Sequence, residues 1–356
     1  MVKNKFLLFC FWLGAICLAL TSCDKDNNGE NSRVPEKVHW NCSVTVIASV
    51  NGLGDNGYVD DAMAGIFEFA EKNSIPLNVV QPESMEEAEK FFQSWLDNSV
   101  NRDSSLLILG SSAYEKMAQK TSFPEKRGKG TRILLFESDN ANLPEGVYGV
   151  SINRYGISYL AGAMCGDYRN AKILAATPHD PVLTPAIQGF QDGFRTYAQK
   201  NCQVSVDYLA QDESGFAMPD SAYRYASRVY EDEMQQEYLY PLIGNSISGI
   251  FKYADEHLFF GTFMVGMDVN MAGMQRNIPF SVVIHIGDVL NRRLSEWYVG
   301  KEWSKTETFG LKDKMVDIEL TPNFDEDIIL GNASDYAGLY RDYYNEALEK
   351  EANYGK

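Results

Sequence analysis

Short apolar runs alternate with amphipathic segments along most of the chain and predict alternating strands and helices. Runs such as residues 106–109 and 133–136 are apolar throughout, unlike a strand with one solvent-facing side. Between such runs, apolar residues recur at helical spacing, as in residues 85–98. Continuous apolar strands are covered on both faces, so the pattern predicts an α/β protein with parallel sheets.

The strand–helix units form two series, which predict two doubly wound lobes around a cleft. The first series has helices after Asp60 and at 85–98, and strands at 44–48, 77–80, 106–109, 132–136 and 146–152. The second has helices at 155–168, 185–201, 221–232 and 246–256, and strands at 172–176, 204–208, 238–243 and 260–266. A strand at 280–283, a helix at 286–299 and a docked helix at 336–347 complete the prediction. We assign the N-terminal lobe to 42–147 plus 283–301, and the C-terminal lobe to 148–282 plus 302–356.

The loop after the first strand carries the first candidate site. Ligands of open parallel sheets bind beside the carboxyl ends of strands and the N-termini of helices, so Asp55, Tyr58 and Asp60 are candidate ligand-binding residues. The loop has neither GxGxxG nor the Gly-Lys-Ser/Thr of a P-loop, and its carboxylates would repel phosphate but accept hydrogen bonds from hydroxyls or amines. The alternatives are a turn-forming role for Asp55, a helix N-terminal role for Asp60 and a loop-covering role for Tyr58. Gly110, which ends the run 106–109, is a further candidate.

The first 41 residues indicate an exported protein. Lys3 and Lys5 precede 15 apolar residues, which are too few for a comfortable transmembrane helix. The following LTSC resembles a bacterial lipobox, and this resemblance implies cleavage after residue 22 and acylation of Cys23. An ordinary secretory signal with a chance cysteine is the alternative. Residues 1–22 are thus predicted to be a lipoprotein signal peptide, and 23–41 a lipidated cysteine and flexible tether, which places the protein on a membrane of the cell envelope, periplasmic or surface-exposed.

Composition narrows the class of function. The net charge of −17 over 356 residues argues against nucleic-acid binding, because no basic stripe is visible to neutralise phosphates. Beyond the signal and Cys23, only Cys42, Cys165 and Cys202 remain, which allow at most one disulfide, and no CxxC or Cys/His cluster suggests zinc. No nucleophile–base pair stands out among four histidines, so we predict a non-enzymatic protein without cofactor or metal.

Five ordered motifs resemble the basic membrane lipoprotein family, the purine-nucleoside-receptor-like binding proteins. They are GLGDNGYVDDAMAG, ISYLAGAMCG, AIQGFQDGF, FMVGMDVNM and GLKDKMVDI. The resemblance implies a type I periplasmic-binding fold that captures nucleosides for an ABC transporter. It implies that Asp55 and Tyr58 belong to the site, that Tyr58 stacks on a base and that Asp268 accepts from ribose hydroxyls. Carried over by position, the resemblance also implies that Glu137, Gly244 and Asn245, which follow strands, belong to the ligand-binding site.

The chain departs from the family pattern at Val59, Ala186 and Ile284, where the family has an asparagine, a stacking phenylalanine and a lysine. The fold is therefore implied more strongly than the ligand. Glu137 has an alternative as a solvated loop acid. We predict a lipid-anchored solute-binding protein for a nucleoside-like molecule, with an ABC permease as partner. The alternatives are a ligand-sensing lipoprotein with a membrane signalling partner and a surface hydrolase.

Overall fold

The computed structural model describes most of the chain beyond the predicted tether. The described residues are 42–50, 52–55, 57–98, 104–123, 128, 130–167, 169–230, 237–257, 262–322, 324 and 335–356. The predicted signal peptide, Cys23 and the tether lie outside them. No helix in the described part of the chain is long and apolar enough to cross a membrane.

The first sheet has six parallel strands in the order β12-β5-β4-β3-β1-β2. These strands are β1 (Cys42–Ala48), β2 (Leu77–Val80), β3 (Ser104–Gly110), β4 (Arg132–Phe136), β5 (Val147–Ile152) and β12 (Thr306–Phe309). Its helices are α1 (Tyr58–Asn73), α2 (Met85–Asn98), α3 (Glu115–Gln119) and α8 (Ile286–Tyr298).

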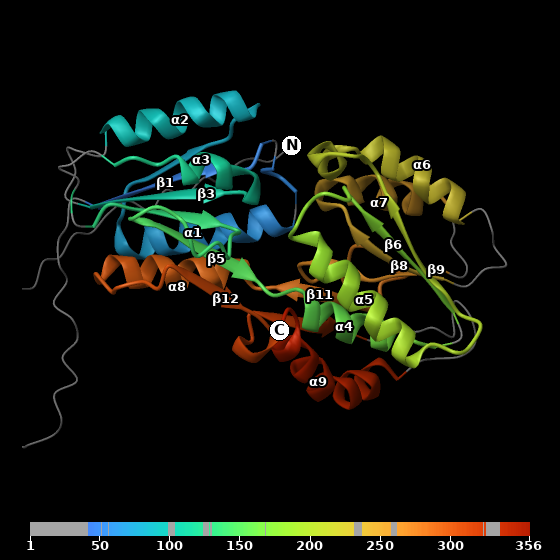
Figure 1. Ribbon diagram of the computed structural model, residues 1–356. Helices are drawn as coiled ribbons and strands as arrows, with labels where there is room; N and C mark the ends of the chain where they lie inside the picture. Colours follow the sequence, from blue (N-terminus) through green and yellow to red (C-terminus); the bar gives the residue numbers. More distant parts are fainter. Residues whose placement is uncertain are drawn as a thin grey trace, which may run out of the picture. The chain divides into compact units, whose positions relative to one another are not determined.

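Both faces of this sheet are buried, as the continuous apolar runs predict (Figure 1). Leu106 and Ile108 of β3 point to one face and belong to the cluster that includes α1 and α8. Leu107 and Leu109 point to the other face and pack with α2 and α3. Successive residues of a strand point to opposite faces, so an uninterrupted apolar run is what a sheet between two helical layers requires.

The second sheet has four parallel strands in the order β7-β6-β8-β9. These are β6 (Asn170–Ala175), β7 (Val204–Tyr208), β8 (Glu237–Leu242) and β9 (Thr262–Met264). Around it lie α4 (Tyr155–Met164), α5 (Leu183–Tyr197), α6 (Pro219–Tyr230) and α7 (Ile247–Glu256), with α9 (Tyr336–Asn353) beside α4 (Figure 1). A Cβ on Gly189 or Gly193 of α5 would come within 2.2 Å of a main-chain oxygen of α4, so the glycines of the AIQGFQDGF motif allow these two helices to touch.

A third sheet joins β10 (Gly266–Asp268), β11 (Phe280–Ile284) and β13 (Val316–Leu320). Strand β13 runs antiparallel to β11, which the sequence pattern did not predict. The single strand predicted at 260–266 is wrong: within the described residues β9 ends at Met264 and pairs with β8, whereas β10 begins at Gly266 and pairs with β11. Both short strands are buried, so their residues form one continuous apolar run. No polar residue marks the point at which the chain passes from one sheet to the other.

Strands β5 and β12 belong to the first sheet, although the predicted lobe boundaries assign most of their residues to the C-terminal lobe. Residues 148–152 and 306–309 fall in the predicted C-terminal lobe, yet β5 and β12 pair with each other and extend the six-stranded sheet. The chain therefore leaves the first sheet after β5 and enters α4, which lies beside the second sheet. It later returns to the first sheet through β12.

Candidate functional site

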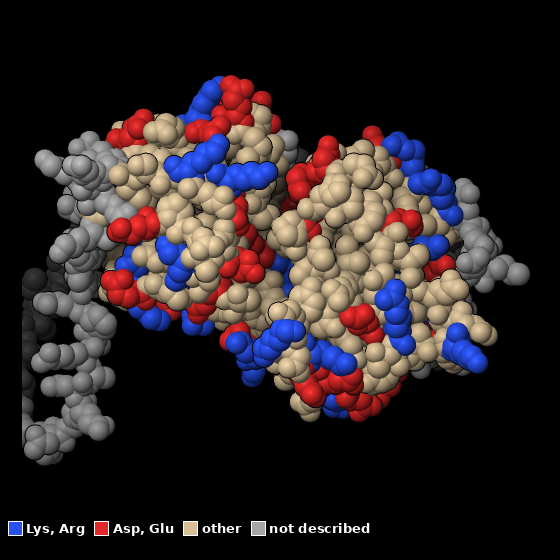
Figure 2. Space-filling view, viewed as in Figure 1, with Lys and Arg blue, Asp and Glu red and all other residues tan. Residues whose placement is uncertain are grey.

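Charged side chains from three sheets gather where strands end. We call the following six residues the strand-end cluster: Asp55, Tyr58, Glu137, Arg154, Asp180 and Asp268. Asp55 and Tyr58 follow β1, Glu137 follows β4, Arg154 follows β5, Asp180 follows β6 and Asp268 ends β10. The space-filling view shows a furrow between the two large lobes, with acidic atoms on its wall and basic atoms at depth (Figure 2). This is the position at which open α/β sheets bind ligands.

Glu137 and Arg154 form a buried ion pair at the centre of the cluster. The guanidinium donates from Nη1 to Oε2 at 2.5 Å and from Nη2 to Oε1 at 2.6 Å, and the Ile152 N–H donates to Oε2 at 3.3 Å. Glu137 is 8% exposed and Arg154 7%. The alternative of a solvated loop acid is therefore wrong for Glu137. A two-pronged contact of this kind is strong and fixes both planes.

Tyr58 is held against this ion pair. Its hydroxyl donates to Oε1 of Glu137, and its ring stacks on Phe136 with centroids 5.4 Å apart. The Arg154 guanidinium lies 5.3 Å from the Tyr58 ring centroid. Burial, and then the nearby charge of Glu137, raise the pKa of Tyr58, so the hydroxyl stays protonated and acts as a donor. The predicted aromatic residue is thus part of the strand-end cluster, and its hydroxyl is already hydrogen-bonded to Glu137.

Asp55 and Asp60 shape the loop that presents Tyr58. The Asp55 carboxylate accepts from the N–H groups of Gly57 and Asp60 through Oδ1, at 2.9 and 3.1 Å, and from Val59 through Oδ2 at 3.0 Å. Asp60 Oδ1 accepts from the Gly54 N–H at 2.9 Å. Both alternatives drawn from the sequence, a turn-forming Asp55 and a helix N-terminal Asp60, are confirmed. Burial nevertheless raises the pKa of Asp55, which shows that these contacts do not fully offset desolvation.

Asp268 is the carboxylate that its surroundings satisfy least. Its backbone is left-handed at φ 65°, a conformation that L-residues other than Asn, Asp and Gly adopt rarely. No hydrogen bond or ion pair to its carboxylate occurs among the described residues. Its pKa is raised to about 6, mainly by burial; the charge of Arg154 lowers the pKa, whereas those of Asp55 and Glu137 raise it. Asp268 is therefore a poorly solvated acceptor facing the ends of first-sheet strands.

The sequence reasoning missed two members of the cluster, Arg154 and Asp180. Asp180 is 7% exposed, and its Oδ1 accepts from the Val182 N–H at 2.8 Å. Burial raises the pKa of Asp180, which also senses the charges of Arg154 and Glu137. Both residues stand within a few positions of a strand's carboxyl end, so the rule that selected Asp55 could have selected them too.

Three predicted residues have no described contact with the cluster. Gly110 pairs with Ala48, and a Cβ on it would lie 3.2 Å from the Ile47 oxygen, so its smallness serves strand packing. Gly244 is left-handed at φ 51° and, with Asn245, forms a 3-10 turn after β8. Asn245 is partly buried at the same edge of the second sheet as Asp180.

The arrangement suits binding of hydroxyl groups rather than a metal. In the part of the chain that the structure describes, no group of three or more His, Cys, Asp or Glu side chains is arranged to hold a metal ion. The cysteines Cys42, Cys165 and Cys202 are all free. Four carboxylates face one guanidinium that Glu137 already occupies, so an anionic ligand would be repelled and hydroxyl donors would find acceptors.

The chain was compared with protein families and known structures. No family model and no curated protein matches it. A solute-binding protein of an ABC transporter system from Aeropyrum pernix K1 has a similar structure, with TM-score 0.66 and 16% identity over 87% of this chain and 89% of that one. This is the periplasmic-binding-protein fold.

Two other similar structures differ in what they are described to do. A transcriptional activator of the comK gene from Bacillus halodurans has TM-score 0.61 and 16% identity, over 88% of this chain and 98% of that one. A periplasmic solute-binding protein of an ABC transporter from Actinobacillus succinogenes 130z, with bound D-allose, has TM-score 0.56 and 12% identity, over 78% and 98%. At such low identity these likenesses show the fold alone. The predicted fold class is thereby confirmed.

Proposed function

We propose that this chain is a lipid-anchored solute-binding protein that captures a nucleoside-like molecule in the furrow at the strand-end cluster and delivers it to an ABC permease. The observation that carries the proposal is Asp268, a partly buried carboxylate in a left-handed backbone without a hydrogen-bond partner in the described chain. Residues held in sparsely populated backbone conformations cluster at ligand sites. The similar structures that are described as ABC solute-binding proteins support the same class of function.

The cluster favours a neutral, hydroxyl-bearing ligand. Asp268 and Asp180 would accept from ribose hydroxyls, and a hydrogen bond to a charged group contributes about 1.5–3 kcal/mol. The Arg154–Glu137 pair and the Tyr58 hydroxyl satisfy one another, so they serve as a rigid wall against which the ligand is placed.

Thermal melting with purine and pyrimidine nucleosides and their 5′-monophosphates tests the proposal. A nucleoside at 100 times its dissociation constant stabilises the folded protein by about 2.7 kcal/mol, whereas the monophosphate gives no shift. The Asp268→Asn variant shows a clearly smaller shift at the same nucleoside concentration, and the control Asp220→Asn, an exposed acid in the first turn of α6, keeps the full shift. If no nucleoside changes the melting temperature, the nucleoside assignment fails.

A sensing role is the second candidate, because some similar structures are described as transcription regulators rather than transport proteins. The same fold thus occurs in proteins of both kinds. Genes for a permease and an ATPase beside this one favour transport, and a gene for a membrane signalling protein favours sensing. Membrane anchoring is tested separately by the fraction in which the full chain is recovered.

A further inference from the structure

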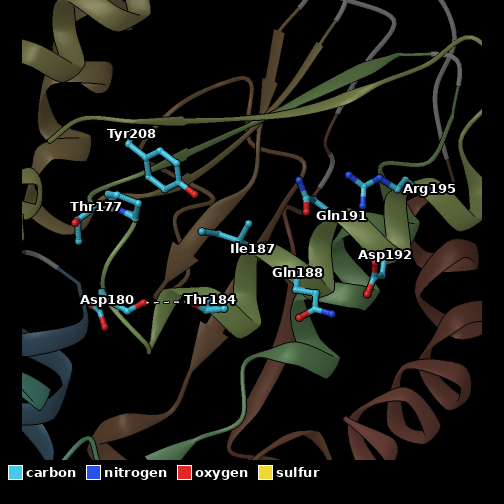
Figure 3. A pocket seen from close by; sticks show the side chains of 10 residues that line it. Thr177, Asp180, Thr184, Ile187, Gln188, Gln191, Asp192, Arg195 and Tyr208 are labelled. Atoms are coloured by element: carbon cyan, nitrogen blue, oxygen red, sulfur yellow. Dashed lines mark hydrogen bonds between the residues drawn. The ribbon is translucent and has the colours of Figure 1, made fainter. Parts of the chain in front are cut away.

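A second hollow lies on the second lobe, between helix α5 and the end of strand β7 (Figure 3). Its volume is about 490 Å³, within the range usual for small-molecule sites. We call it the α5 hollow. Asp180 lines this hollow and also belongs to the strand-end cluster. None of the other residues that line the hollow is a member of that cluster.

An exposed aromatic ring forms one wall of the α5 hollow. Tyr208 is the last residue of β7, an edge strand, and it is 41% exposed. Figure 3 shows its ring reaching into the hollow in the direction of Ile187. Its hydroxyl makes no hydrogen bond within the described chain. A tyrosine side chain in this position offers an apolar face and a polar tip to a ligand.

The opposite wall consists of planar polar groups on one face of α5. Gln188, Gln191 and Arg195 are spaced three and four residues apart, so they stand in a row along the helix. Gln188 Oε1 accepts from the Tyr354 hydroxyl at 3.3 Å, which leaves its amide donors available. Gln191 and Arg195 form no hydrogen bond or ion pair with any described residue.

The hollow on the other side of β7 is a useful contrast. It has about 450 Å³ and also includes Tyr208, but several of its polar side chains pair with one another. Lys172 lies 3.3 Å from Glu237, and the Tyr225 hydroxyl donates to Asp207 at 2.8 Å. In the α5 hollow, by contrast, neither Gln191 nor Arg195 has such a partner among the described residues.

We propose that the α5 hollow binds the ring of a neutral sugar. The apolar face of a pyranose would lie on Tyr208, and its hydroxyls would meet the amides of Gln188 and Gln191 and the guanidinium of Arg195. Two acids, Asp180 and Asp192, line the hollow together with Arg195, so an anionic ligand is not favoured. The inference goes beyond the proposed function, since it requires neither a nucleoside nor a lipid anchor.

Saturation-transfer NMR titrations with methyl β-D-glucopyranoside and methyl β-D-galactopyranoside test this inference on the folded chain. We expect at least one glycoside to bind, Tyr208→Ala to weaken binding about tenfold and Tyr208→Phe to change it by less than about twofold, because stacking needs the ring and not the hydroxyl. Gln191→Ala weakens binding, whereas Arg228→Ala, in the other hollow, leaves it unchanged. All three positions are at least partly exposed, so melting temperatures should remain close to that of the unmodified chain.

Three results would overturn the inference. The first is that neither glycoside binds, and the second is that Tyr208→Ala binds as tightly as the unmodified chain. The third is that Asp268→Asn abolishes binding while Tyr208→Ala does not, which would locate the sugar at the strand-end cluster. None of these results affects nucleoside-dependent melting, so failure here is distinguishable from failure of the proposed function.

Discussion

Replacing Asp268 by asparagine should stabilise the empty protein and weaken its ligand binding at once. The substitution removes a charge that is poorly solvated and that faces Asp55 and Glu137. Asparagine tolerates the left-handed backbone at φ 65°, so the local fold is kept. Opposite effects on stability and binding are expected of a residue retained for function rather than for folding.

The effect on stability follows from the pKa. The folded state raises the pKa of Asp268 from 3.8 to about 6, and roughly two pKa units at 1.36 kcal/mol each correspond to about 3 kcal/mol. Because the raised pKa belongs to the folded state, this destabilisation is absent below pH 3.8, grows between pH 3.8 and 6, and is complete above pH 6. The Asp268→Asn variant should therefore gain several degrees in Tm at pH 7.5 and almost nothing at pH 4.

The effect on binding has the opposite sign. Loss of a charged acceptor costs about 1.5–3 kcal/mol, or roughly 10- to 150-fold in Kd. In the unmodified chain, binding should also weaken about tenfold from pH 7 to pH 5, because the carboxylate is then largely protonated. The variant has no such acid, so its remaining affinity should vary less across this range.

Differential scanning calorimetry from pH 4 to 8 measures the stability effect, and calorimetric titration with a nucleoside measures the binding effect. Asp220→Asn is the matched control, since it removes the same charge from an exposed helix start. A variant that is less stable than the unmodified chain at pH 7.5, or equally stable at every pH, would refute the reasoning about Asp268.

The remaining predictions concern the ion pair, the helix packing and the anchor. Arg154→Ala leaves Glu137 buried without its partner and should cost about 3–5 kcal/mol in urea unfolding, with partial recovery on adding Glu137→Gln; no loss would contradict the buried pair. Gly65→Ala puts a Cβ 2.1 Å from a main-chain oxygen of α8 and should lower stability by about 1–3 kcal/mol, whereas Gly273→Ala, in open space, should not; equal melting would refute the close approach. Cys23→Ser should move the full chain from the membrane to the soluble fraction, and unchanged fractionation would exclude the lipid anchor.

Local pattern was sufficient to predict most of the sheet strands. Strands β2 and β4 and helix α2 have the predicted bounds, because their apolar residues are grouped in a short run or helically spaced and polar residues flank them. Strand β12 was missed because its residues, TETF, are mostly polar and only Phe309 is fully buried. This edge strand is defined by its pairing with β5, and the local sequence does not reveal that pairing.

The site was predicted in part for a related reason. The carboxyl ends of strands pointed to Tyr58, Glu137 and Asp268, which the structure brings into one cluster, but their mutual contacts depend on how distant strands are ordered in space. Arg154 looks like an ordinary charge before a helix, and its importance becomes visible only when Glu137 is brought against it. Ala186, where the family pattern has a stacking ring, is 1% exposed, and the glycines of its motif serve the contact between α4 and α5.

The central claim is that acids at the strand ends hold a neutral, hydroxyl-bearing solute. Isothermal titration of a nucleoside panel into the unmodified chain and into Asp268→Asn tests it most directly. The account predicts saturable binding of one molecule per chain for at least one nucleoside, none for its 5′-monophosphate, and at least about tenfold weaker binding by the variant. Binding of the monophosphate as tight as that of the nucleoside, or full affinity in Asp268→Asn, would contradict it.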